Sequence, residues 1–268
     1  MDPLMIALIV AVFTLIVLFS GIPIAFGLSF VSIALLIAFE GLQMLDVFAE
    51  TFYAGLNSFV LLSIPMFILM GMAVAHSPAG KDLYTGLDRW LWRVPGGLVI
   101  SNIGACSIFA ALSGSSPATC AAIGTMGIPE MRKRGYSDQI ATGTIAAGGT
   151  LGVLIPPSIV LIVYGMATGT SIGRLFLSGV VPGFMLASLF AIWALIHSYF
   201  IDKNAAKLLR NRKPPTLKEK FEVLPRVFPF LAIIIGVLYV LYGGVATPSE
   251  ASGVGAFLVF VMIAVVYK

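Results

Sequence analysis

The nine residues LSGSSPATC, Leu112–Cys120, decide the fold. They place three serines, a threonine, a glycine and a proline between two apolar runs. Hydrophobic residues make up 59% of the chain and charged residues only 10%. Soluble domains carry about 25% charged residues, so this composition excludes that class and indicates an integral membrane protein. A polar stretch at membrane depth is tolerated only where protein buries it or where it lines a watery cavity.

Basic residues gather in three segments between the apolar runs, and these segments predict the topology. Loops on the cytoplasmic side carry an excess of Lys and Arg, so all three segments are expected inside. They contain Lys81, Arg89, Arg93; Arg132, Lys133, Arg134; and Lys203, Lys207, Arg210, Arg212, Lys213, Lys218, Lys220, Arg226. The net charge of +4 therefore reflects topology and indicates no nucleic-acid partner.

Two of these basic segments flank Leu112–Cys120 and limit the chain between them. Only 38 residues, 94–131, separate Arg93 from Arg132. Two full spans of about 20 residues each would nearly exhaust that length. We therefore predict a re-entrant helical hairpin with its tip at 112–120. The alternative is an ordinary helical pair with a small polar turn at the outer surface.

A second interruption is predicted at AAGGTLGVLIPPS, Ala146–Ser158. It lies inside the apolar run Ile140–Thr168, which as one helix would be about 43 Å long, too long for a hydrocarbon core of about 30 Å. Pro156 and Pro157 lack an N–H and disfavour helical geometry in the preceding residue. The pattern predicts a broken helix with its break at 149–158. The alternative is a proline kink in a tilted helix.

Two interrupted elements in one chain predict the binding site of a secondary transporter. Freed backbone carbonyls and the hydroxyls of Ser113, Ser115, Ser116 and Thr119 would form an oxygen site without fixed charge, which suits Na+. Helix N-termini near Pro117 and Pro157 would favour an anion. Because neither element contains an acidic proton carrier, we expect sodium coupling rather than proton coupling.

A weak internal repeat extends the prediction to the whole chain. LFSGIPIAFGLS (Leu18–Ser29) and LYGGVATPSEASG (Leu241–Gly253) both place a turn, a proline and small residues between two apolar runs. Charge counting puts the two turns on opposite sides of the membrane, as an inverted repeat requires. We expect scaffold and interfacial helices at 1–95, a transport unit at 96–200, a basic cytoplasmic arm at 201–226 and the start of a second scaffold at 227–268. The chain is then the N-terminal part of a larger permease.

Four motifs taken together resemble the large membrane subunit of tripartite ATP-independent periplasmic (TRAP) transporters. They are SGSSPAT, GTLGVLIPPS, PEMRKRGYS and GGVATPSEA. The resemblance implies an all-α membrane protein with the elevator fold of the ion-transporter superfamily, in the bacterial inner membrane. It implies a small membrane subunit, a periplasmic substrate-binding protein and membrane lipid as partners.

The same resemblance implies Na+-driven uptake of an organic acid anion, of the C4-dicarboxylate or sialic-acid type. It also implies that the hairpin tip and the helix break share a sodium site. Carried onto this sequence, the ligands are Ser113, Ser115, Ser116 and Thr119, with backbone oxygens from Gly152, Leu154 and Pro156.

Three other functions remain as alternatives to a sodium-coupled transporter. A channel could use the re-entrant hairpin as a selectivity filter. An intramembrane enzyme has no support, because the chain contains no Ser/His, HExxH or paired-carboxylate arrangement. A purely structural subunit would leave both interruptions unexplained.

Overall fold

The apolar runs fold into helices, which in lipid satisfy every backbone hydrogen bond within the segment. A computed structural model describes residues 2–94, 96–197, 215–222 and 224–267, and these residues contain no strand. The all-α prediction is confirmed. By packing, the chain divides into two units, Met1–Ser58 and Phe59–Lys268. Most of the predicted basic arm at 201–226 lies outside the described residues.

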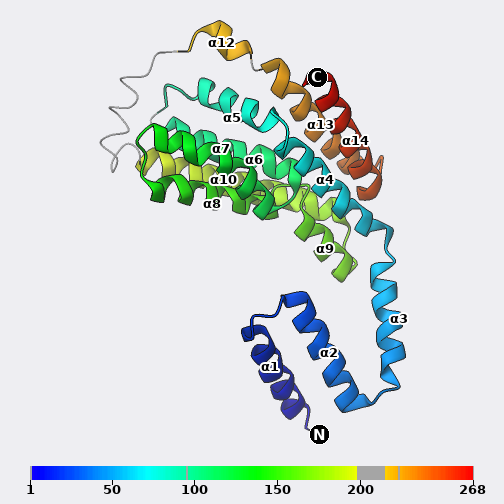
Figure 1. The fold of residues 1–268 in the computed structure, drawn as a ribbon. Coiled ribbons are helices and arrows are strands. Elements are labelled where there is room, and N and C mark those ends of the chain that lie inside the picture. Colours follow the sequence, from blue (N-terminus) through cyan, green and yellow to red (C-terminus); the bar gives the residue numbers. More distant parts are fainter. Residues whose placement is uncertain (1, 95, 198–214, 223, 268) are drawn as a thin grey trace. The chain divides into compact units, whose positions relative to one another are not determined.

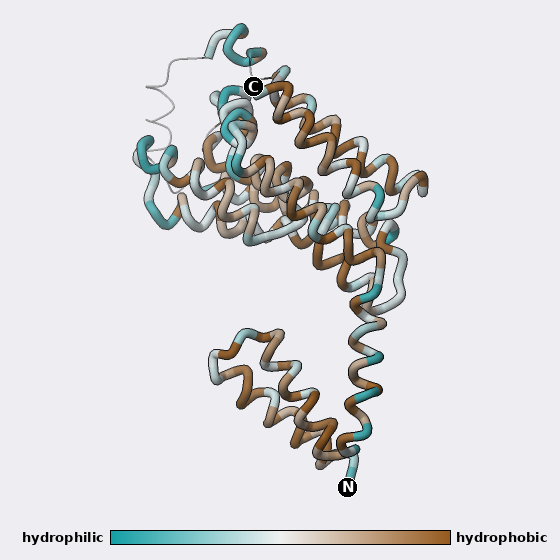
Figure 2. The backbone as a smooth tube through the Cα atoms, turned by 45° about the vertical axis from the view of Figure 1, so that its right-hand side comes forward, coloured by the Kyte–Doolittle hydropathy of each residue, from teal (hydrophilic) through white to brown (hydrophobic). Residues whose placement is uncertain are grey.

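The first unit contains three helices, α1 (Pro3–Phe19), α2 (Ile24–Glu40) and α3 (Met44–Leu56). Helices α1 and α2 form a hairpin, and Gly27 of α2 lets the side chain of Val17 approach closely. Helix α3 alternates hydrophilic and hydrophobic residues, whereas α1 and α2 are mainly hydrophobic (Figure 2). Helix α3 is therefore amphipathic, as expected of the interfacial helices predicted within 1–95.

The second unit is built around a helical hairpin, α6 (Gly97–Ser113) and α7 (Ser116–Lys133). Helix α8 (Asp138–Leu154) packs along both of its arms, and α10 (Ile172–Ile196) packs on α6 and α8 (Figure 1). The side chains of Phe109, Ile123, Leu151 and Phe176 are fully buried between these helices. A pair of helices joined within 112–120 is confirmed, and the re-entrant placement of its tip in the membrane stays a prediction.

The remaining helices of the second unit pack around the same core. They are α4 (Ser63–Ala75), preceded by the 3-10 turn η1 (Phe59–Leu62), α5 (Ala79–Trp90), α12 (Leu217–Glu222), α13 (Leu224–Tyr242) and α14 (Pro248–Val266). Helix α14 lies along α4 and α13 (Figure 1). Helix α5 is a second amphipathic helix within 1–95, where interfacial helices were predicted.

Helix α14 begins with a reciprocal cap at Thr247 and Glu250. The Thr247 hydroxyl accepts from the Glu250 N–H at 3.4 Å, and the Glu250 carboxylate accepts from the Thr247 N–H at 2.8 Å. Together these bonds form a capping box, which satisfies N–H groups at the start of the helix. The helix starts at Pro248, because proline fits the first helical turn, where its missing N–H is not needed.

The predicted helix break is confirmed, but it is shorter than the sequence suggested. Helix α8 continues to Leu154, and only Ile155–Ser158 separate it from α9 (Ile159–Thr168). The break lies at the C-terminal end of the predicted range 149–158, beside Pro156 and Pro157, and the first part of that range, with Gly149 and Gly152, is helical. Both glycines serve close packing, since a Cβ at Gly149 would lie 1.9 Å from the Cys120 sulfur.

Three stretches of the described residues are long and apolar enough to cross a membrane. They are Asp138–Thr168, Ile172–Ile196 and Pro248–Val266, with a fourth if Met44–Leu56 and Phe59–Ala75 are counted as one span. In Figure 2, α13 and α14 are mainly hydrophobic, while the short α12 is hydrophilic. These properties agree with the membrane protein that the composition predicted.

Candidate functional site

The hairpin tip is shaped by Gly114 and Ser115. Helix α6 ends at Ser113, and Gly114 reverses the chain in the left-handed region, with φ of 61°, where glycine pays no Cβ penalty. Ser115 is the N-cap of α7, and its hydroxyl accepts from the Ala118 N–H at 3.5 Å. Pro117 lies in the first turn of α7. This local sequence therefore specifies a tight turn between two helices.

Two of the four predicted hydroxyl ligands and one backbone carbonyl lie together at the tip. The hydroxyls of Ser113 and Thr119 lie 3.1 Å apart. Both donate to the Ser115 carbonyl, Thr119 at 2.8 Å and Ser113 at 3.4 Å. Ser113 and Thr119 are buried. The result is a small cluster of oxygen atoms with no fixed charge.

The tip packs directly on the helix break, about 40 residues further along the chain. The Ile159 N–H donates to the Gly114 carbonyl at 3.0 Å. The Ser116 hydroxyl donates to the Thr150 carbonyl at 3.5 Å. A Cβ at Gly152 would lie 2.7 Å from the Ser115 carbonyl carbon and from the Ser116 nitrogen. The two interrupted elements therefore form one junction.

The three backbone ligands predicted from the resemblance have different surroundings in the structure. Gly152 lies against the tip, at Ser115 and Ser116. Pro156 is buried in the break. The Leu154 carbonyl instead lies beside α10, 2.5 Å from the position of a Cβ on Gly179. Gly152 and the four hydroxyl residues thus meet at the junction, and Leu154 contacts another helix.

Ser158 was missed by sequence reasoning, although it ends the motif GTLGVLIPPS. It is fully buried, and its hydroxyl has no hydrogen-bond partner among the described residues. Its neighbours Pro157 and Ile159 both contact Gly114 at the tip. Its position immediately after two prolines, where α9 begins, was the signal that could have identified it.

Four helix ends converge at this junction. Helices α6 and α8 end there, at Ser113 and Leu154, and α7 and α9 begin there. The last carbonyls of a helix have no intrahelical partner and carry partial negative charge, while the first N–H groups carry partial positive charge. Residues 112–120 and 152–158 contain no charged side chain. The junction therefore offers neutral oxygens to a cation and the positive partial charge of two helix ends to an anion, although the N–H groups of Ala118, Thr119 and Ile159 are already bonded within the protein.

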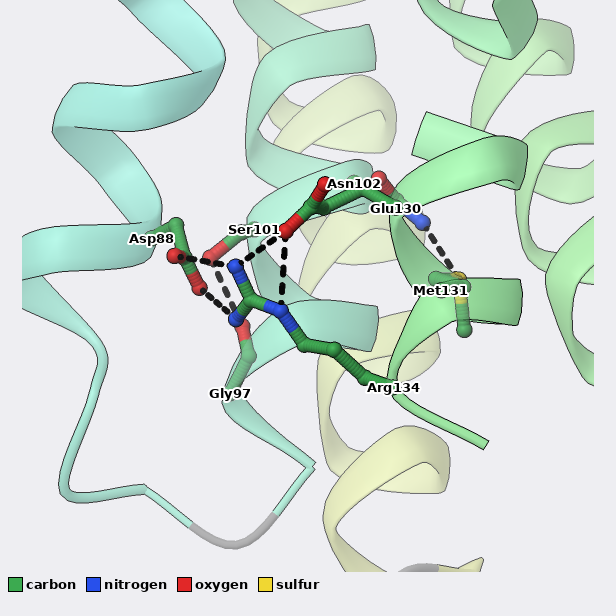
Figure 3. A network of polar contacts seen from close by, with 7 residues as sticks. All are labelled: Asp88, Gly97, Ser101, Asn102, Glu130, Met131 and Arg134. Carbon is green, nitrogen blue, oxygen red and sulfur yellow. Dashed lines mark hydrogen bonds and ion pairs between the residues drawn. The ribbon is translucent and has the colours of Figure 1, made fainter. Parts of the chain in front are cut away.

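A second polar cluster lies at the far end of α7, where Arg134 joins two helices (Figure 3). Its guanidinium donates to both carboxylate oxygens of Asp88 on α5, each at 3.1 Å. It also donates twice to one carboxylate oxygen of Glu130, at 2.6 and 3.0 Å. The Asp88 side chain is 8% exposed. The sequence predicted only that Arg134 lies on the cytoplasmic side of the membrane. It did not predict the ion pair between Arg134 and the buried Asp88.

The chain also matches known proteins along nearly its whole length. A sequence model of the family described as "Tripartite ATP-independent periplasmic transporter, DctM component" matches residues 9–268. The chain belongs to this family. Membership of the TRAP large-permease family confirms the resemblance carried by the four sequence motifs.

Several TRAP permeases are similar to this chain. The C4-dicarboxylate TRAP transporter large permease protein of Vibrio cholerae is 38% identical over 250 residues, which cover 92% of this chain and 53% of that protein. The isethionate TRAP transporter permease protein of Oleidesulfovibrio alaskensis is 36% identical over 237 residues, 88% of this chain and 36% of that protein. The sialic acid TRAP transporter large permease protein of Vibrio cholerae is 32% identical over 251 residues, 94% of this chain and 57% of that protein.

The chain spans about half the length, or less, of these TRAP relatives. Their names describe permeases, which are transporters rather than enzymes, as the sequence predicted.

Proposed function

We propose that this chain forms part of a permease that takes up an organic acid anion, driven by a sodium gradient. The observation that carries the proposal is the junction of the hairpin tip and the helix break, where four helix ends and five uncharged polar side chains meet. A small membrane subunit and a periplasmic substrate-binding protein would complete the transporter. The bacterial inner membrane is the proposed location.

The sodium site would use oxygens from both elements. Carbonyls at the C-terminal ends of helices α6 and α8 would supply negative partial charge, as half-helix ends do in transporters. The hydroxyls of Ser113, Ser115, Ser116 and Thr119 would complete the shell together with the Gly152 and Pro156 carbonyls. The Leu154 carbonyl would join them only after turning away from α10. The described residues hold no cluster of three His, Cys, Asp or Glu side chains, so this proposed site uses neutral ligands.

The substrate would bind beside the sodium ion, at the N-termini of α7 and α9. These ends present N–H groups and a positive partial charge, which favour an anion. The similar permeases are named for C4-dicarboxylate, isethionate and sialic acid. We propose an organic acid of this kind as the substrate. The unit at 96–200 would then carry both ions across the membrane by an elevator movement.

Replacing Ser116 by alanine tests the sodium site directly. Loss of one oxygen ligand should raise the Na+ concentration for half-maximal uptake about tenfold, which corresponds to ~1.4 kcal/mol. Uptake is measured in proteoliposomes that contain the full-length permease and its partners. The control is Ser107→Ala, which removes a hydroxyl bonded within α6 and away from the tip. Unchanged sodium dependence in both Ser116→Ala and Ser113→Ala would overturn the site.

Ser158→Ala separates binding from stability. The buried Ser158 hydroxyl has no partner in the part of the chain that the structure describes, and an unpaired buried hydroxyl costs about 1–3 kcal/mol. Its removal should therefore leave the thermal stability of the Na+-free protein unchanged or slightly higher. If Na+ uses this oxygen, the stabilisation by Na+ should fall. A variant that is less stable without Na+ and equally stabilised by it would show that the hydroxyl is structural.

A further inference from the structure

A polar pocket lies between helices α5 and α7, apart from the tip and break junction. Its volume is about 340 Å³, at the small end of ligand pockets. Helix α5 contributes Lys81, Tyr84, Thr85 and Asp88 to its wall. Helix α7 and the residue that follows it contribute Thr125, Met126, Pro129, Glu130, Lys133 and Arg134.

The charges around this pocket leave an excess of positive charge. Arg134 is bound to Asp88 and Glu130, so these two carboxylates already have a cationic partner. Lys133 lies only at the edge of this network, with its ammonium 3.9 Å from Glu130. Lys81 forms no ion pair with any residue that the structure describes. Three cations against two carboxylates give a net charge of +1. The Lys81 ammonium has no ion-pair partner among the described residues, and the Lys133 ammonium has only its 3.9 Å contact with Glu130.

Tyr84 adds a neutral donor to the same wall. The residue is 5% exposed, and its hydroxyl has no hydrogen-bond partner among the described residues. Burial, together with the negative charge of Asp88, raises the pKa of Tyr84 above its ordinary range. The hydroxyl therefore stays protonated and can donate. A buried donor without a partner is costly. The hydroxyl oxygen itself has almost no accessible surface, so a group bound in the pocket would supply the missing acceptor after a small turn of the Tyr84 side chain toward it.

The position of the pocket indicates where its ligand comes from. Helix α5 is amphipathic, with Leu83 buried and Trp90 exposed at its end. Tryptophan is enriched at the membrane interface, and basic residues mark the cytoplasmic side. Lys81, Lys133 and Arg134 belong to two of the three basic segments that predict that side. The cytoplasmic leaflet holds anionic lipids, whose head groups attract such residues.

We propose that this pocket binds the phosphate of an anionic phospholipid from the cytoplasmic leaflet. Lys81 and Lys133 contact the phosphate oxygens, and the Tyr84 hydroxyl donates to the head group. The pocket is independent of the sodium site, so its test does not depend on transport. The bound lipid fastens α5 to the end of the hairpin helix α7, beside the Asp88–Arg134 ion pair.

The test uses full-length permease in detergent and follows its thermal unfolding temperature. The probes are dioctanoyl phosphatidylglycerol, dioctanoyl phosphatidylcholine and inorganic phosphate. Phosphatidylglycerol should raise the unfolding temperature in a saturable way, and the other two should not. The double variant Lys81→Gln, Lys133→Gln should weaken the apparent affinity for phosphatidylglycerol at least about tenfold, because two charge-assisted contacts are lost.

Two further variants make the test specific. The first is the double variant Lys203→Gln, Lys207→Gln, which removes two positive charges from the basic segment at 203–226. If contacts in the pocket matter more than general attraction of anionic lipid to basic residues, this variant should change the affinity for phosphatidylglycerol less than about twofold. Tyr84→Phe should weaken phosphatidylglycerol binding without lowering the unfolding temperature of the lipid-free protein.

Three outcomes would overturn the proposal. They are an equal loss of affinity in the two double lysine variants, equal stabilisation by phosphatidylcholine, and stabilisation by inorganic phosphate but not by phosphatidylglycerol. Undiminished binding in Tyr84→Phe would remove the tyrosine from the site and overturn the proposed geometry.

Discussion

Replacing Arg134 by methionine should lower the free energy of unfolding by about 3 kcal/mol, the lower end of the cost of removing one partner from a buried ion pair, because Asp88 is buried but the Arg134 side chain is 27% exposed. The Asp88 carboxylate, 8% exposed, would lose the two 3.1 Å hydrogen bonds that compensate its burial. Glu130 would lose its main cation as well. Denaturant titration of the full-length permease in mixed micelles measures the change.

The matched control for this prediction is Arg132→Met, two residues earlier. Arg132 also bonds a carboxylate, that of Asp138, at 2.7 Å, but the two side chains are 56% and 68% exposed. Exposed pairs contribute about 0–1 kcal/mol, so the control should lose little stability. The double variant Arg134→Met, Asp88→Leu should recover most of the loss, because no uncompensated charge stays buried. Equal, small losses in both single variants would show that the Asp88 site is well solvated.

Replacing Gly152 by alanine should abolish transport, because the tip and the break would no longer fit together. The new Cβ would lie 2.7 Å from two backbone atoms, the Ser115 carbonyl carbon and the Ser116 nitrogen. A side chain can rotate away from such a contact, but backbone on both sides cannot. Overpacking of this kind costs up to about 3 kcal/mol, which corresponds to about 100-fold in the population of the closed junction. Sodium-driven uptake in proteoliposomes measures the loss.

Gly143→Ala is the control in the same helix. A Cβ at Gly143 meets no atom within 4 Å. Alanine also has the better helix propensity, by about 1 kcal/mol. This variant should therefore transport normally and be equally or more stable. Normal uptake in Gly152→Ala would mean that the junction is open during transport, and the sodium site would then need other ligands.

The sequence alone was enough to predict the two interrupted elements, because proline and glycine act locally. Gly114, Pro156 and Pro157 limit their own backbone and that of their neighbours, whatever the rest of the chain does. The cap at Thr247 and Glu250 was predictable for the same reason, since both partners lie within one helical turn. The resemblance to the TRAP large-permease family was likewise recognisable, because it depends on the order of four short local motifs.

The contacts between distant residues were not predictable in this way. Gly149 and Gly152 looked like helix breakers, but in the structure they are helical and allow Cys120 and the hairpin tip to approach. The ion pair between Arg134 and Asp88 joins residues 46 apart in the chain. Charge counting places both on one side of the membrane, but only tertiary packing decides which carboxylate meets which guanidinium.

The contact of α14 with α4 has a consequence for biosynthesis. The Ser249 hydroxyl donates to the Phe59 carbonyl, 190 residues earlier. At about 5–20 residues per second, α4 is made roughly 10–40 s before its partner. Buried Ser63 donates to the Val60 carbonyl, and buried Ser252 to the Ser249 carbonyl. The Ser63 and Ser252 hydroxyls are thus satisfied locally before the two helices meet, whereas the Ser249 hydroxyl and the Phe59 carbonyl gain their shared hydrogen bond when α14 arrives.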